Sequence, residues 1–286
     1  MTTTTIIKLG GAAITNKHCE DELSPHLDRI VDEIVAVHPT TRLVLIHGAG
    51  GFGHPPAKHY ALKQGWTPAD PHKKLGFAMT RCHVLDLHHH LLTRLIAKGL
   101  PVVSVSPFEQ TCTSGGVPSS HLGRRVEVVL QAGLIPLLYG DAVLDAQWGC
   151  TILSGDVIMR KLAQTMAVDR CVFVTDVSGV YTANPKTDAG ATLVRQIIVD
   201  PTVKEVVMVA DDDDDTVADV TGGMQAKIQC AREIVCSTQA QVVICRSLTD
   251  PTCTVFTAKP TRLDPLPFLI CHGLALTLYY IITLDK

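Results

Sequence analysis

The stretch RLVLIHGAGGFGH, residues 42–54, joins an apolar run to a segment with four glycines and a final histidine. Uninterrupted apolar runs are typical of strands buried on both faces of a parallel sheet. Glycines let the backbone approach a ligand closely, so that several N–H groups can point at one anion. The stretch therefore predicts a phosphate-binding loop at a strand end, with His54 beside the phosphate. The alternative is an ordinary turn with a structural histidine.

Apolar, β-branched runs of the same kind occur five more times and end in glycine-rich or polar turns. Helical patterns lie between them, which predicts an open, mainly parallel α/β sheet with helices on both faces. In such sheets ligands collect at the carboxyl ends of the strands, where the glycines also lie. The further runs are 4–11, 100–107, 134–141, 171–179 and 240–247, and the helical patterns are 24–38, 76–99 and 124–133.

The chain has 286 residues, with 25 Lys and Arg against 28 Asp and Glu, and ten cysteines without a C-x-x-C pair. This balanced charge argues against a nucleic-acid-binding surface, which needs a basic patch. Scattered cysteines fit neither a zinc site nor a disulfide framework, so we expect reduced thiols in a cytoplasmic protein. The N-terminus lacks the basic start and apolar core of a secretory signal.

Two segments have an unusual composition. The acidic run 211–215 predicts a solvated loop, because like charges repel one another and stay exposed. Residues 267–284 contain no Asp, Glu, Lys or Arg, so they fit a membrane anchor or a buried terminal strand and helix. His272 and Gly273 make this run a poor anchor, and we do not expect membrane attachment.

Three other glycine clusters share the setting of the first. The segment KLGGA, residues 8–12, ends a strand, and its lysine and Lys17 can both reach one anion. It matches neither a Walker A loop nor a dinucleotide fingerprint. The segment 175–181 closes another strand, and two glycines open the helical run 222–235, where free N-terminal amides attract anions. Together the clusters predict a nucleotide and a second phosphate in one site.

Six motifs in this order resemble the amino acid kinase superfamily, and the GxFGH ending of the second resembles its isopentenyl phosphate kinase branch. They are KLGGAAITNK, HGAGGFGH, LYGD, ILSGD, TDVSGVYTANP and DVTGGMQAKI. The resemblance covers about residues 5–250 and implies a three-layer α/β/α sandwich, a homodimer, and phosphoryl transfer from ATP with Mg²⁺ to isopentenyl phosphate. It implies one domain over 1–256, in which about 1–150 bind the acceptor and 151–256 bind ATP. Residues 257–286 do not resemble the family and form an atypical apolar tail.

The resemblance also implies a role for each matching residue. Lys8 would contact the ATP phosphates, Lys17 would stabilise the transferring phosphoryl group, and His54 would hold the acceptor phosphate. Ala49 and Gly140 match acceptor-side positions. The nucleotide-side matches are Lys8, Gly10, Gly11, Gly50, Asp156, Asp176, Gly179, Tyr181, Gly223 and Lys227.

Two residues depart from the family pattern, since Ala12 replaces a serine and Ala49 replaces a glycine, but neither change removes a charge. An apolar acceptor tail needs an apolar pocket, for which Phe77 and Ile152 are candidates, with plain core as the alternative. We expect no dedicated metal site, because the consecutive histidines 88–90 point in different directions on a helix.

Two other functions fit parts of the pattern. One is phosphorylation of a phosphonate such as fosfomycin, because the GxFGH ending also resembles that branch of kinases. A non-catalytic nucleotide-binding regulator would keep the fold, but loss of Lys8, Lys17 or Asp156 would have favoured it, and all three are present. The resemblance therefore favours phosphorylation of isopentenyl phosphate by direct in-line transfer, a step in isoprenoid precursor biosynthesis.

Overall fold

A computed structural model describes residues 3–16, 19–119, 121–185, 187–200, 206–210 and 222–259. Lys17, the acidic run 211–215 and the apolar run 267–284 lie outside these residues. Within them, no helix has both the length and the apolar character needed to cross a membrane.

Six adjacent parallel strands, which end at the edge strand β3, form the larger part of the main sheet, in the order β13-β9-β1-β2-β6-β3. Each of them coincides with one of the apolar runs, so the prediction of an open, mainly parallel sheet is confirmed. The strands are β1 (Thr4–Leu9), β2 (Arg42–His47), β3 (Val102–Ser104), β6 (Ile135–Tyr139), β9 (Arg170–Val174) and β13 (Gln241–Cys245).

The sheet continues beyond β13 through strands that the apolar runs did not reveal. Strand β14 is antiparallel to β13 and parallel to β11, which in turn pairs antiparallel with β10 and β12. The bounds are β10 (Val180–Tyr181), β11 (Leu193–Val199), β12 (Val206–Ala210) and β14 (Cys253–Ala258). Strand β14 therefore runs two residues past 256, the expected end of the domain.

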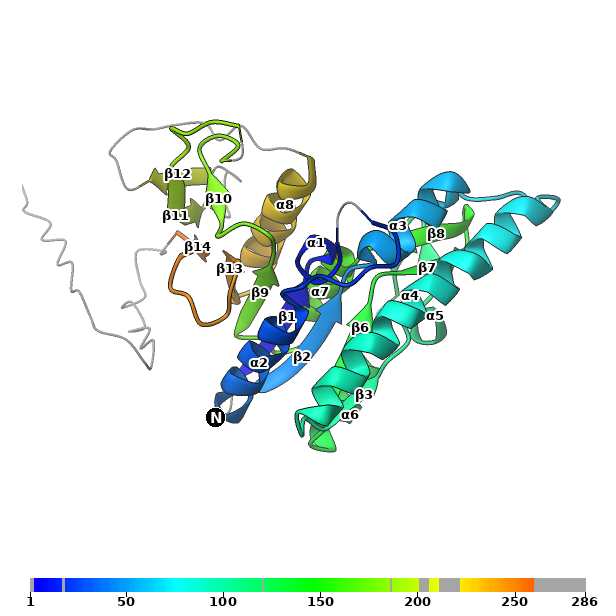
Figure 1. Ribbon diagram of the computed structural model, residues 1–286, viewed down its shortest axis with the longest axis horizontal. Coiled ribbons are helices and arrows are strands. Elements are labelled where there is room, and N and C mark those ends of the chain that lie inside the picture. The colour runs from blue at the N-terminus through cyan, green and yellow to red at the C-terminus, as the bar shows by residue number, and fades with distance from the viewer. Residues whose placement is uncertain are drawn as a thin grey trace, which may run out of the picture.

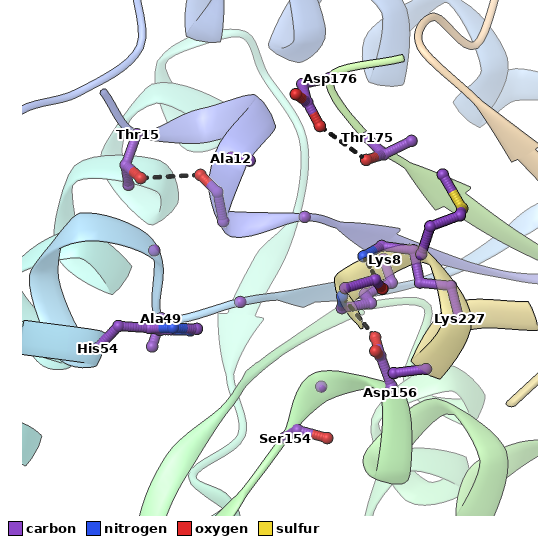
Figure 2. A pocket seen from close by; sticks show the side chains of 18 of the residues that line it. Lys8, Ala12, Thr15, Ala49, His54, Ser154, Asp156, Thr175, Asp176 and Lys227 are labelled. Atoms are coloured by element: carbon purple, nitrogen blue, oxygen red, sulfur yellow. Dashed lines mark hydrogen bonds and ion pairs between the residues drawn. The ribbon is translucent and has the colours of Figure 1, made fainter. Parts of the chain in front are cut away.

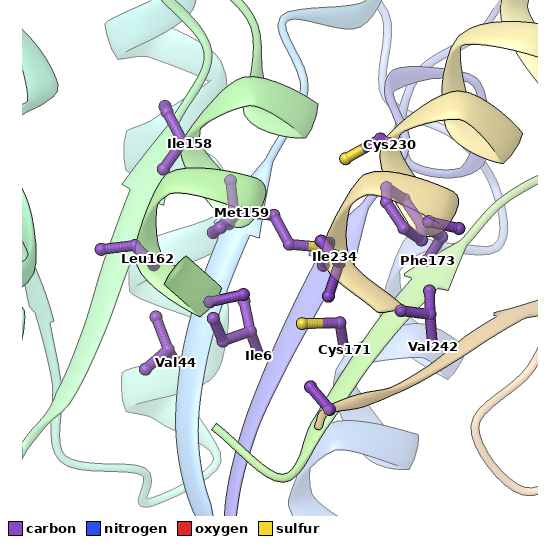
Figure 3. Packing of buried hydrophobic residues seen from close by; sticks show 14 of the residues in the cluster. Ile6, Val44, Ile158, Met159, Leu162, Cys171, Phe173, Cys230, Ile234 and Val242 are labelled. Atoms are coloured by element: carbon purple, nitrogen blue, oxygen red, sulfur yellow. The ribbon is translucent and has the colours of Figure 1, made fainter. Parts of the chain in front are cut away.

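Helices cover both faces of the main sheet and complete three layers (Figure 1). On β1, Ile6 packs with α6, α7 and α8, whereas Ile7 packs with α2 and α4, as the alternation of side chains along a strand requires. Figure 3 shows the first of these interfaces, where Ile158 and Ile234 approach the strands. The helices are α2 (Leu27–Val37), α4 (Pro71–Ala97), α6 (His121–Gln131), α7 (Gly155–Thr165) and α8 (Gly222–Ser237).

A second, four-stranded sheet lies beside the acceptor half, in the order β5-β4-β7-β8. The buried Asp145 carboxylate holds it together by accepting hydrogen bonds from the N–H groups of Gly115 (3.1 Å), Gly116 (2.8 Å) and Trp148 (2.9 Å). The strands are β4 (Thr113–Ser114), β5 (Val117–Pro118), β7 (Asp141–Asp145) and β8 (Gly149–Leu153), and the short helices are α1 (Gly11–Ile14), α5 (Pro107–Gln110), η1 (His38–Thr40) and η2 (Leu62–Gln64).

The glycine-rich stretch after β2 is not simply a turn, because helix α3 (Gly50–His59) begins inside it. Gly50 has a φ of +52°, which a residue with a side chain rarely adopts, and this lets the chain reverse into the helix. A Cβ on Gly53 would lie 2.5 Å from Val84 Cγ2, so the glycine permits close packing of α3 on α4. Tertiary contact thus overrides the low helix propensity of Gly and Pro.

Candidate active site

The predicted site residues surround one cavity of about 880 Å³ at the carboxyl ends of β1, β2 and β9. Strand β1 lies between the other two, and the chain proceeds from it toward both edges of the sheet, so the cavity occupies the switch point where open α/β sheets bind ligands. The predicted residues that line it are Lys8, Gly10, Gly11, Ala49, Gly50, His54, Gly140, Ile152, Asp156, Asp176, Gly179, Tyr181, Gly223 and Lys227. Phe77 does not line it.

Two glycine turns meet at the centre of the cavity. A Cβ on Gly11 would lie 2.5 Å from Gly50 Cα, so only glycine at position 11 allows the backbones after β1 and β2 to touch. Thr15 links the same turns, because its hydroxyl donates to the Gly11 carbonyl (2.8 Å) and accepts from the Gly51 N–H (2.9 Å). The cavity floor is therefore a fixed backbone surface rather than two independent loops.

Lys8 projects from β1 into the cavity wall and pairs with Asp156, with 2.5 Å between Nζ and Oδ1 (Figure 2). The lysine is buried, so the carboxylate offsets part of the cost of removing its charge from water. A Cβ on Gly155 would lie 3.1 Å from Lys8 Cε, which shows how closely α7 approaches the lysine stem. Asp156 thereby holds the ammonium group in one place at the N-terminus of α7.

Three longer helices begin at the cavity, namely α3 at Gly50, α7 at Gly155 and α8 at Gly222. Helix N-termini carry partial positive charge and unpaired N–H groups, which together attract anions. Ser154 caps α7 by accepting a hydrogen bond from the Val157 N–H (3.3 Å) and also lines the cavity. The arrangement can hold more than one phosphate group.

His54 lies in the first turns of α3, with an exposed side chain on the rim of the cavity. Neighbouring protein atoms that displace water from part of the ring, and then the positive charge of Lys8, lower the pKa of His54 below its ordinary value. The imidazole is therefore neutral at pH 7, and a bound phosphate dianion would favour its protonated, hydrogen-bond-donating form. Figure 2 shows His54 and Lys8 on different elements around the same space.

The opposite wall comes from β9 and the segment after it. Thr175 donates a hydrogen bond to the Asp176 carboxylate (3.2 Å). Thr254 of β14 fixes the segment that contains Gly179, since its hydroxyl accepts from the Val180 N–H at 2.7 Å. Lys227 reaches the same wall from α8, where its Nζ donates to the Gly223 carbonyl at 3.0 Å. These contacts bring the predicted nucleotide-side residues together.

The two candidates for an apolar pocket have different positions. Ile152 lines the cavity, whereas Phe77 lies behind it in an apolar cluster that Ile152 also contacts. The ring of Phe77 is 5.0 Å from that of Trp66 and 6.0 Å from that of Phe108, measured between centroids. Ile152 is therefore in reach of a ligand, and Phe77 supports the wall.

Thr15, Ser154 and Asn184 also line the cavity, although the sequence did not single them out. Ser154 and Asn184 lie inside motifs already quoted, and a serine ahead of a helical run is a recognisable N-cap. Thr15 also lies inside a quoted motif, KLGGAAITNK, but nothing local marks it, because its role depends on two turns that are distant in the sequence.

The histidines of α4 do not form a cluster. His83 contacts Asp21, with Nδ1 and Oδ1 2.9 Å apart, while His88 is buried and its Nδ1 lies 3.1 Å from Nε2 of His47. Among the described residues there is no group of three or more His, Cys, Asp or Glu side chains that could hold a metal ion.

A sequence model of the amino acid kinase family matches residues 3–246. The chain belongs to this family. Among its relatives, the isopentenyl phosphate kinase of Methanothermobacter thermautotrophicus is 34% identical over 234 residues, which cover 78% of this chain and 84% of the relative. The isopentenyl phosphate kinase of Arabidopsis thaliana is 37% identical over 224 residues, which cover 74% of this chain and 66% of the relative.

The fold of this amino acid kinase family member is similar to that in X-ray structures of isopentenyl phosphate kinase. One such structure gives a TM-score of 0.74 at 28% identity and covers 89% of this chain and 100% of its own. This structural similarity confirms the expected three-layer architecture.

Proposed function

We propose that the protein transfers the γ-phosphoryl group of ATP to isopentenyl phosphate, giving isopentenyl diphosphate and ADP. The observation that carries the proposal is the joining of two phosphate-type sites in one cavity, with Lys8 at one and His54 at the other. The names of the relatives support the same reaction. A histidine that faces a phosphate has a clear task here, which it would lack beside a carboxylate acceptor.

In this reaction an oxygen of the acceptor phosphate attacks the γ-phosphorus in line with the departing ADP oxygen. The protein needs no covalent nucleophile, because positioning and neutralisation of charge carry most of phosphoryl transfer. Lys8 would neutralise the nucleotide phosphates, and backbone N–H groups at Gly10, Gly11 and Gly50 would donate hydrogen bonds to them. His54 would hold the acceptor phosphate, and Lys17, outside the described residues, would stabilise the group in transfer.

The donor set also fits Mg²⁺ that arrives with the nucleotide. Such an ion keeps several water and phosphate ligands and needs one or two carboxylates from the protein. Asp156 and Asp176 line the cavity and could each supply an oxygen, although Asp156 also pairs with Lys8. When bound, the ion would neutralise charge on the transferring phosphates.

The family resemblance supports three further parts of the proposal. Residues of about 1–150 bind the acceptor, and the residues from 151 to the end of β14 at Ala258 bind most of the nucleotide. The protein acts as a homodimer, which light scattering of the purified chain would test. We also propose a cytoplasmic location, which imaging of a tagged chain would test.

ADP release tests the reaction, with isopentenyl phosphate, fosfomycin, glutamate or no acceptor, for the wild type and His54→Ala. We expect turnover with isopentenyl phosphate and a collapse of that turnover in the variant. Turnover with fosfomycin alone would preserve the mechanism and replace the substrate. If the folded, ATP-binding protein is silent with every acceptor, the proposal is wrong and a regulator becomes the better explanation.

A further inference from the structure

Two histidines that the proposed reaction does not use lie buried behind the phosphate-binding loop. His47 is the last residue of β2 and is fully buried, and His88 is a buried residue of α4. Burial lowers the pKa of His47 to about 4 and that of His88 to about 3, the latter helped by the neighbouring imidazoles of His47 and His89. Both rings are therefore neutral at pH 7, and each has one donor and one acceptor nitrogen.

These neutral rings belong to a hydrogen-bond chain with a fixed direction. Nδ1 of His47 lies 3.0 Å from the Gly48 carbonyl oxygen, which can only accept, so this nitrogen carries the proton. Nε2 of His47 must then accept from Nδ1 of His88, 3.1 Å away. Nε2 of His88 in turn accepts from the Ser104 hydroxyl at 2.8 Å. Donation thus runs from Ser104 through both histidines to Gly48.

The hydrogen-bond chain ends at the Gly48 carbonyl and fixes the orientation of the Gly48–Ala49 peptide group in the cavity. A trans peptide places its C=O and N–H on opposite sides, so a Gly48 carbonyl turned toward the His47 ring directs the Ala49 N–H the other way. Gly48 and Ala49 both line the cavity, and among the described residues no carbonyl accepts from the Ala49 N–H. The carbonyl, which would repel an anion, is kept out of the cavity while the donor is left available.

The backbone of His47 also contacts Gly140, the other position expected on the acceptor side. Its carbonyl accepts a hydrogen bond from the Gly140 N–H at 2.9 Å, and its ring stacks on Tyr139 with centroids 5.7 Å apart. One residue therefore contacts both backbone segments, Gly48–Gly51 and Gly140, that face the acceptor.

We propose that Ser104, His88 and His47 are positioning residues that aim the Ala49 N–H at the acceptor phosphate through the Gly48 carbonyl. The proposal deepens the proposed function, since it assigns the outer support of the same acceptor site. His47 acts most directly, His88 acts through His47, and Ser104 acts through both.

Steady-state kinetics of a graded series test this order. His47→Leu removes the donor to Gly48, and we expect the kcat/KM for isopentenyl phosphate to fall about 10- to 100-fold with an unchanged KM for ATP. His88→Leu should have a smaller effect and Ser104→Ala the smallest. His47→Asn keeps an N–H near the Nδ1 position and should recover most of the loss.

Leu91→Ala is the matched control, because it empties a fully buried position of the same helix α4 without a link to Gly48. It should lower thermal stability and leave both KM values alone. Equal changes in the ATP and acceptor constants, or no gain from asparagine over leucine at position 47, would overturn the proposal. If His47→Leu does not fold, the milder Ser104→Ala and His88→Asn carry the same comparison, since asparagine keeps a donor toward His47.

Nitrogen NMR of the imidazole rings gives a readout that does not need turnover. We expect protons on Nδ1 of both His47 and His88, and an Nε2–H form of His47 would contradict the direction of the chain. Titration with inorganic phosphate should shift the Ala49 amide resonance in the wild type and much less in His47→Leu. If the wild type does not phosphorylate isopentenyl phosphate but this difference persists, the proposed function fails and the positioning role stands; if both proteins shift alike, the positioning role is wrong.

Discussion

The two walls of the cavity each depend on a pair of polar side chains, of which only Asp156 is half-buried rather than buried, and the pairs differ in charge. Lys8 on β1 pairs with Asp156 as ions, whereas His47 on the neighbouring strand pairs with His88 as neutral rings. The sheet register places Leu9 opposite His47, so the two pairs are separated by little more than one strand.

The difference follows from what each wall has to do. The nucleotide brings several negative charges, and a fixed ammonium group attracts them strongly where water is scarce. The acceptor side already has Lys8 close enough to lower the pKa of His54, and a second fixed cation there would be costly to bury. A neutral pair orients a backbone donor without adding charge. The wall with Lys8 and Asp156 therefore attracts the nucleotide phosphates, and the wall with His47 and His88 orients a hydrogen-bond donor toward the acceptor.

Removal of Lys8 should have the largest effect. Lys8→Met keeps the length of the stem but leaves Asp156 without its partner and the nucleotide phosphates without their cation. We expect kcat to fall about 1000-fold, which is about 4 kcal/mol of transition-state stabilisation. Steady-state rates with saturating ATP measure this, with thermal unfolding to confirm that the variant folds. A loss below 10-fold would show that the wall with Lys8 and Asp156, the charged wall, is not the source of the attraction for the nucleotide phosphates.

Acid should weaken the fold through the neutral pair. The pKa of His47 is about 4 in the folded protein and about 6.5 in the unfolded chain, so the unfolded chain binds more protons between these values. The free energy of unfolding is then unaffected by this residue above pH 6.5 and falls by about 3 kcal/mol as the pH approaches 4. Urea unfolding across this range measures the loss, and His47→Leu should flatten the slope while Leu91→Ala should not.

His54→Ala tests the acceptor side of the cavity at its rim. It removes a side chain that touches the acceptor in the proposed reaction, and we expect the kcat/KM for isopentenyl phosphate to fall about 100-fold. His54→Gln is the matched variant, because it keeps a donor without the ability to become charged. A full recovery by glutamine would show that His54 acts by hydrogen bonding alone, and an unchanged alanine variant would remove it from the site.

The sequence identified both residues of the Lys8–Asp156 pair, but by different routes. Lys8 and the glycines that follow it lie within four residues of one strand end, which is a local signal. Asp156, in the first turn of α7, was assigned by the family resemblance, and its pairing with Lys8 was not predicted. The central strands were equally readable, since each is an unbroken apolar run bounded by a turn. Such features need no knowledge of what packs against them.

The neutral wall could not be read in the same way. His47 and His88 are 41 residues apart, and nothing in the histidine run of α4 marks one ring as the buried partner of another. Helix α3 was missed because glycine and proline disfavour helices, and its packing on α4 decides the outcome. The β7–β8 hairpin has an unusual turn that depends on Asp145 and on Gly149 with its φ of +76°.

The smallest effect concerns a glycine that contacts both walls. A Cβ on Gly155 would lie 3.1 Å from Lys8 Cε, 3.2 Å from Ile46 Cγ2 and 3.5 Å from the His47 carbonyl oxygen. The first two contacts are tight and the third is ordinary, so Gly155→Ala should displace the lysine more than the histidine. We expect the KM for ATP to rise by about 10-fold, or about 1.4 kcal/mol, with an unchanged KM for isopentenyl phosphate. Comparable rises in both KM values would mean that the two walls are mechanically joined at Gly155, and a change confined to the acceptor constant would contradict the expected displacement of Lys8.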